Sequence, residues 1–145
     1  MGLIDSIKSG WRWTSLEPAA VIDQNAFGNV IVLDRDGGYW RICPEELSCK
    51  IVASDPESFE RLRATSEFVV DWTVERLAAA ARAKLGPPPD GSCYCLKIPA
   101  VLGGAYDAEN FGTTTVGELL AASGDIARQI NGLPDGSKVL FVIKD

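Results

Sequence analysis

Four cysteines, Cys43, Cys49, Cys93 and Cys95, are the side chains with the most distinctive chemistry in this sequence. Zinc sites built from four thiolates usually hold about two to four residues between paired cysteines. Here the two pairs enclose five residues and one residue. Cys93 and Cys95 fall in a predicted strand, where alternate side chains point the same way and form a disulfide poorly. We therefore expect four reduced thiols and no bound metal.

Catalytic chemistry has few other candidates in the chain. Histidine is absent, which excludes Ser-His-Asp and Cys-His catalysis. No stretch matches a phosphate-binding loop or a nucleophile elbow. Gly103-Gly104 does not make a phosphate cradle, because residues 98–127 contain no Lys or Arg. No spacing of carboxylates singles out an acid–base pair. We predict no catalytic residue, no cofactor and no enzymatic activity.

Acidic side chains gather in two stretches. Residues 98–127 contain four acids and no base, and residues 43–60 contain five acids and a single lysine. Two such stretches on one small domain could form a patch that mimics phosphates or binds a basic partner. The alternative is an acidic surface that only keeps the protein soluble.

The 103–110 loop is the best single candidate for partner binding, because it is long, rich in glycine and acidic. Asp107 and Glu109 would steer association, and Tyr106 would supply buried contact area. The alternative is a loop that closes the core, with Tyr106 packed inward and Asn110 bonding its own backbone turn. The full set of partner-binding candidates is Tyr106, Asp107, Glu109, Asn110, Glu45 and Glu46.

Composition places these candidates in an ordinary globular domain. The chain has 145 residues, of which 46% are hydrophobic and 23% charged, as expected of a single domain over residues 1–145. Fourteen Lys and Arg against 20 Asp and Glu give a net charge of −6, which argues against direct nucleic-acid binding. The first residues lack the pattern of a signal peptide, and no apolar run is long enough to span a membrane, so we expect a cytoplasmic protein.

Strands are predicted most strongly over residues 29–43. Residues 30–33 form a continuous apolar run, typical of a strand covered on both faces, and Asp36-Gly37 is a hairpin signal. Trp11 and Trp13 suggest an extended segment with both indoles on one side. Further strands are expected at residues 20–23, 49–53, 92–98 and 139–143, whereas residues 99–114 are expected to form a long ordered loop.

Helices are predicted at residues 3–10, from Asp55-Pro56 to Leu85 with a second cap available at Thr65-Ser66, and from the Thr115 capping box onwards. Gly124 favours a kink or break in the last helix. The 55–85 helix carries a predicted buried stripe of Val70, Val74, Leu77, Ala81 and Leu85. Together the elements predict an α+β domain, with a mixed, largely antiparallel sheet and helices mainly on one face.

Two groups of residues resemble a known family. The first is Phe27-Gly28-Asn29-Val30 with the following hairpin to Glu46. The second is Leu102-Gly103-Gly104-Ala105-Tyr106 with Asn110, followed by Ser123-Gly124-Asp125 and Leu133-Pro134-Asp135-Gly136. They look like the C-terminal domain of type VI secretion DNase-immunity proteins, formerly a domain of unknown function, over residues 25–145. The hairpin is also loosely similar to the SUKH superfamily of toxin-immunity proteins.

The resemblance implies a non-enzymatic protein that binds and neutralises a secreted toxin, such as a basic nuclease. Family members often carry an additional N-terminal domain. Only about 24 residues precede the resembling region, so we expect that domain to be absent or severely shortened. The alternative from a different class is an intracellular protein with a small-molecule pocket near the 103–110 loop.

Overall fold

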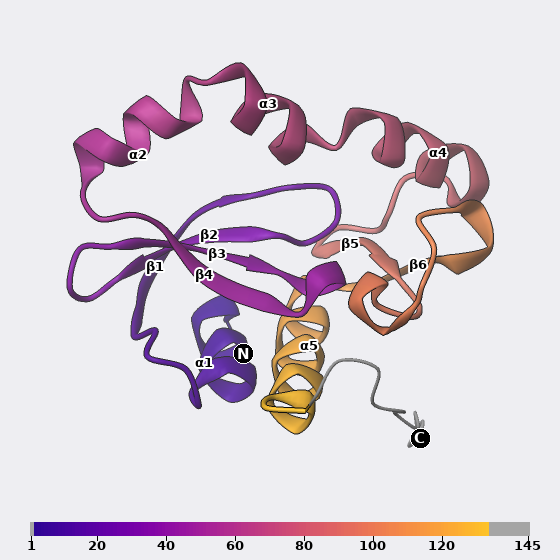
Figure 1. Ribbon diagram of the computed structural model, residues 1–145. Helices are drawn as coiled ribbons and strands as arrows, with labels where there is room; N and C mark the ends of the chain where they lie inside the picture. The colour runs from indigo at the N-terminus through magenta and orange to yellow at the C-terminus, as the bar shows by residue number, and fades with distance from the viewer. Residues whose placement is uncertain (1, 134–145) are drawn as a thin grey trace.

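The computed structural model describes residues 2–133 (Figure 1). The predicted strand at residues 139–143 and most of the Leu133–Gly136 turn lie outside the described residues. The larger sheet is antiparallel with the strand order β1-β2-β3-β4. Its strands are β1 (Pro18–Gln24), β2 (Val30–Asp34), β3 (Tyr39–Cys43) and β4 (Ser48–Ala53). The predicted Asp36-Gly37 hairpin joins β2 to β3, and Gly37 adopts the positive φ of 93° that the turn requires.

Helices cover both faces of this sheet. On one face, Val30, Val32 and Ile42 pack against α1 (Leu3–Trp11) and α5 (Val116–Ile130). On the other face, Ile31 packs with side chains of α2 (Pro56–Arg63) and α3 (Ser66–Thr73). Figure 1 shows α2 and α3 on the opposite side of the sheet from α1 and α5. The sequence predicted helices mainly on one face, but the apolar run in β2 buries both of its sides and needs a cover on each.

A second, two-stranded sheet pairs β5 (Ser92–Leu96) with β6 (Phe111–Thr115) in antiparallel register. It packs with α4 (Glu75–Leu85) around Phe27, Tyr94 and Phe111. The sequence predicted a loop where β6 lies and one continuous sheet. The backbone N–H of Tyr94 donates to the carbonyl of Ala26 at 2.9 Å, which ties β5 to the β1–β2 turn. The predicted α+β fold class is confirmed.

Three helices instead of one long helix span residues 56–85. The Asp55 side chain caps α2, and the Thr65 hydroxyl caps α3, as the sequence indicated. A further break occurs at Val74, which adopts a left-handed conformation with φ of 43°. This break changes the helical phase, so Val70 is 73% exposed whereas Ala81 is fully buried. The predicted stripe is therefore wrong at Val70, and it is also wrong at Leu85, which is 39% exposed.

Helices α1 and α5 cross at two glycines, Gly10 and Gly124, whose backbones touch. The sequence predicted a kink or break at Gly124, but no break occurs there, because α5 continues through it. Trp11 belongs to α1 rather than to an extended segment, and its ring stacks on Trp13 with centroids 6.0 Å apart. The Trp11 indole N–H donates to the Leu120 carbonyl at 3.0 Å, and that of Trp13 donates to the Gly124 carbonyl at 3.1 Å.

Candidate partner-binding site

The two acidic stretches of the sequence meet in a groove of about 260 Å³, which we call the acidic groove. One wall is the α3–α4 junction, and the other is the 3-10 turn η1 (Pro44–Glu46) with Tyr106 of the 103–110 loop. Its lining residues are Arg41, Cys43, Glu45, Glu46, Asp71, Val74, Leu77 and Tyr106. Three of the six predicted site residues, Glu45, Glu46 and Tyr106, therefore come together.

Tyr106 bridges the groove from the loop to η1. Its hydroxyl donates to Glu46 Oε1 at 2.9 Å, across 60 residues of sequence. Burial and the hydrogen bond to Glu46 raise the pKa of the Tyr106 hydroxyl, so it remains a neutral donor. Tyr106 is still 41% exposed, so it is not packed inward as the core-closing alternative required.

A buried polar network holds Arg41 in place at the groove. Asn29, which is fully buried, donates through Nδ2 to Glu45 Oε1 at 2.6 Å. Its Oδ1 accepts from Arg41 Nε at 3.1 Å and Nη2 at 2.9 Å. The Arg41 guanidinium also pairs with the Asp71 carboxylate and lies 5.2 Å from the Trp72 ring centroid. The guanidinium is thus held by three neighbours, Asn29, Asp71 and Trp72.

Glu45 is 8% exposed, so most of its carboxyl group is out of a partner's reach. Burial raises the pKa of the Glu45 carboxyl above its ordinary value. Hydrogen bonds from its own backbone, Asn29 and Cys43 lower the pKa, but their effect is smaller. The sequence predicted Glu45 together with Glu46 as surface acids. The η1 turn separates them, because Glu46 points to solvent whereas Glu45 points into the Asn29 network.

Asp107 and Glu109 are exposed on the 103–110 loop and do not line the groove. Asn110 holds the base of that loop. Its Oδ1 accepts from Ile98 N, and its Nδ2 donates to the carbonyls of Ile98 and Ala105, all at 2.9 Å. Asn110 therefore bonds the local backbone, as the core-closing alternative expected.

Sequence reasoning missed Arg41, Asp71 and the Val70 region. Arg41 and Asp71 are 30 residues apart, and no local pattern links them. Val70 was placed in the core. In the structure it lines a second hollow of about 360 Å³, next to the acidic groove, with Asp71, Thr73, Val74, Glu75, Arg76 and Leu77.

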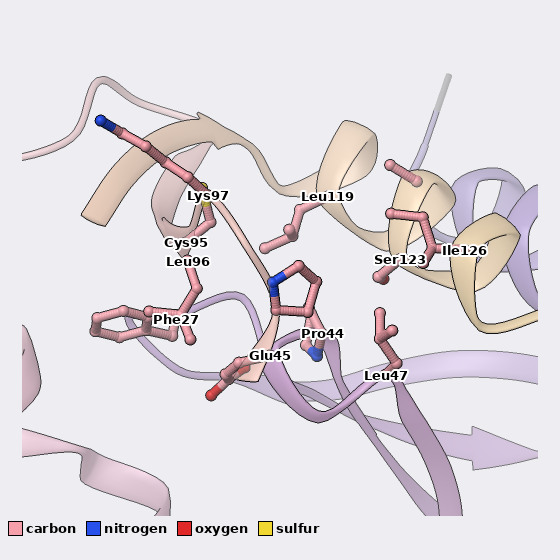
Figure 2. A pocket seen from close by; sticks show the side chains of 12 residues that line it. Phe27, Pro44, Glu45, Leu47, Cys95, Leu96, Lys97, Leu119, Ser123 and Ile126 are labelled. Atoms are coloured by element: carbon pink, nitrogen blue, oxygen red, sulfur yellow. The ribbon is translucent and has the colours of Figure 1, made fainter. Parts of the chain in front are cut away.

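An apolar cavity of about 150 Å³ lies between η1, β5 and α5 (Figure 2). Phe27, Pro44 and Leu119 surround it, and the Lys97 side chain extends away from it. Pro99 contributes to its lining, but residues 103–110 do not. The cavity is smaller than the roughly 300–1,000 Å³ of typical small-molecule sites. It therefore gives little support to the small-molecule alternative.

The four cysteines are free. Burial raises the pKa of Cys43, Cys49 and Cys93 to about 12, and it also raises the pKa of Cys95. Because the thiolate is the reactive and metal-binding form, these side chains are poor nucleophiles near neutral pH. Within residues 2–133 no three potential ligands cluster as a metal site would require.

Residues 53–127 match the family model described as the type VI secretion immunity protein Tdi1, C-terminal. The match spans just over half of the 145 residues. The chain belongs to this family. No curated protein matches it.

The family match confirms the resemblance, over a shorter region than the predicted 25–145. The matched Tdi1 C-terminal region holds α2, α3, α4, the small sheet and most of α5, and so includes Asp71 and Tyr106. Arg41 and Glu46 lie before it. The wider SUKH resemblance stays a prediction. In the part of the chain that the structure describes, every helix is too short or too polar to cross a membrane.

Proposed function

We propose that this protein binds and neutralises a cognate secreted toxin in the cytoplasm, without catalysing a reaction. Membership of the Tdi1 C-terminal family is the observation that carries the proposal. A role in immunity needs only a binding surface. The groove's lining includes the Cys43 thiol hydrogen-bonded to Glu45, but burial raises the pKa of Cys43 to about 12, which makes it a poor nucleophile near neutral pH.

The toxin we propose is a nuclease. A nuclease presents basic residues to the phosphates of its substrate, and an acidic surface complements them. Glu46, Asp107 and Glu109 are exposed, and Tyr106 is half exposed between them. Such acids accelerate encounter with a basic partner, and an aromatic side chain contributes contact area once the partners have met.

The decisive experiment uses a candidate toxin chosen from the products of the genes beside this protein's gene. The toxin is expressed in a bacterial host with and without the protein, and survival and complex formation are measured. We expect rescue of growth, a stable complex and loss of DNA cleavage. Rescue without a complex, or a complex without rescue, would contradict direct neutralisation. If the toxin alone leaves both DNA and RNA intact, the target is not a nuclease.

The acidic loop is tested by reversing Asp107 and Glu109 together to Lys. Both side chains are exposed and outside the described hydrogen bonds, so the melting temperature should stay nearly constant. Association should become slower, most clearly at low salt, where charges act over longer distances. Reversal of Asp36 and Asp90, two exposed acids in other turns, makes the same change in net charge and should slow association less. Equal rates for the two double variants would exclude the loop from the interface.

A further inference from the structure

The two hollows beside the α3–α4 junction form one continuous surface. The acidic groove and the hollow at Val70 share three lining residues, Asp71, Val74 and Leu77. We call this combined area the α3–α4 surface. It extends from Tyr106 and Glu46 at one end to Val70 at the other.

An exposed apolar side chain, Val70, marks the end of this surface on α3. Val70 lines the hollow and is 73% exposed, although the predicted apolar stripe would bury it. Polar side chains, Asp71, Thr73 and Glu75, surround Val70 in its hollow. An apolar centre with a polar rim is the usual anatomy of a protein–protein interface.

The backbone that presents this surface is strained at Val74 and is held by hydrogen bonds. Val74 is β-branched and left-handed, a conformation that such residues rarely adopt. The residues just before it are fastened to the larger sheet. Asn25 donates to the Trp72 carbonyl at 3.1 Å, and the Trp72 indole donates to Asp23 at 3.1 Å. A strained backbone held in this way is typical of functional sites.

The charge of the α3–α4 surface is negative overall. Its lining contains four acids, Glu45, Glu46, Asp71 and Glu75, against Arg41 and Arg76. Arg41 is already engaged by Asp71 Oδ2 and Asn29, and Glu46 Oε1 by Tyr106. Among residues 2–133, no hydrogen bond uses Asp71 Oδ1 or Glu46 Oε2. These oxygens remain able to accept hydrogen bonds from a cationic partner.

We propose that the α3–α4 surface is the docking site for the toxin. An apolar side chain of the toxin covers Val70, and an adjacent Arg or Lys reaches between Asp71 and Glu46. Its aliphatic stem lies along Val74 and Leu77, and its head bonds the remaining carboxylate oxygens. This inference rests on the proposed function, because it names the surface that an immunity protein would use and the chemistry of its partner.

The test measures binding of the same neighbouring toxin, in catalytically inactive form, to single variants. Val70→Asp places a charge where the apolar contact is proposed. Because Val70 is exposed, the variant should fold with an unchanged melting temperature and bind at least tenfold more weakly. Ile51→Asp is the matched control, since Ile51 is 55% exposed but lies on β4. It should bind like the parent.

Glu46→Gln tests the cationic contact, because glutamine keeps an acceptor for the Tyr106 hydroxyl while removing the charge. Affinity should fall several-fold and depend less on salt. If the parent protein binds the toxin and Val70→Asp binds as well as the parent, this docking site is wrong although the proposed function stands. Equal losses in Val70→Asp and Ile51→Asp also overturn it. If the parent does not bind, the proposed function itself fails.

Discussion

Replacing Gly124 by alanine should destabilise the protein, although the same change stabilises most helices. A Cβ at residue 124 would lie 2.3 Å from the carbonyl carbon and oxygen of Gly10 and 2.6 Å from its Cα. Ordinary contacts begin near 3.4 Å, so α1 and α5 must separate. Overpacking of this kind costs about 1–3 kcal/mol.

Two further terms set the expected size. Separation of the helices also stretches the indole hydrogen bonds from Trp11 and Trp13, each worth about 0.5–1.5 kcal/mol. Because alanine favours a helix more than glycine does, the substitution also stabilises the protein by about 1 kcal/mol. We therefore expect the free energy of unfolding to fall by about 2 kcal/mol, measured by urea denaturation.

Gly117→Ala in the same helix is the control. Its new Cβ would meet only the Ser6 side chain, at 2.8 Å for Oγ, and that side chain can rotate away. Its stability should be unchanged or raised by up to about 1 kcal/mol. If Gly124→Ala is as stable as Gly117→Ala, the close crossing of α1 and α5 does not constrain the fold and the reasoning fails.

Three further predictions concern stability and thiol chemistry. Trp72→Ala should lower the free energy of unfolding by about 3–5 kcal/mol, because it leaves a cavity beneath α3. If calorimetry shows the same unfolding transition as in the parent, Trp72 does not pack in the core. Glu45→Gln should change the pH dependence of stability. Because burial raises the folded-state pKa of Glu45, its contribution is fully present below the ordinary value of 4.5 and is lost as pH rises through the folded pKa. Urea titrations of parent and variant from about pH 4 to 8 should therefore show the parent losing stability relative to the variant, and parallel curves would contradict this. Alkylation of lysed cells under denaturing conditions should modify all four cysteines in mass spectra, and one equivalent of zinc in the native protein would refute the metal-free assignment.

Local signals in the sequence were sufficient to predict the helix caps and the tight hairpin. Asp55, Thr65 and Thr115 each accept a backbone hydrogen bond at the predicted helix start, because capping depends on residues only three positions apart. The same holds for Asp36-Gly37, where the turn dictates the residue types.

Features that depend on distant partners could not be predicted. Strand β6 is rich in threonine inside a glycine-rich stretch, and it becomes a strand by pairing with β5, for example Thr114 with Cys93. Val74 gives no local sign of a left-handed backbone, so one helical phase could not be extended across it. For this reason Val70 was wrongly predicted to be buried. The same is true of the candidate site. Its residues Glu45, Glu46 and Tyr106 were predicted from the sequence. Arg41 and Asp71 were not, because they meet only in the folded chain.

The contact between α1 and α5 has a consequence for the order of folding. The Trp11 indole and the Leu120 carbonyl are separated by 109 residues, so this contact closes a very long loop. A ribosome takes roughly 5–20 s to synthesise that length, and during this time Ile7 and Trp11 have no helix to cover them. The core between the larger sheet, α1 and α5 is therefore completed late in synthesis. Chains released before α5 is made should expose the apolar side chains of α1 to proteases.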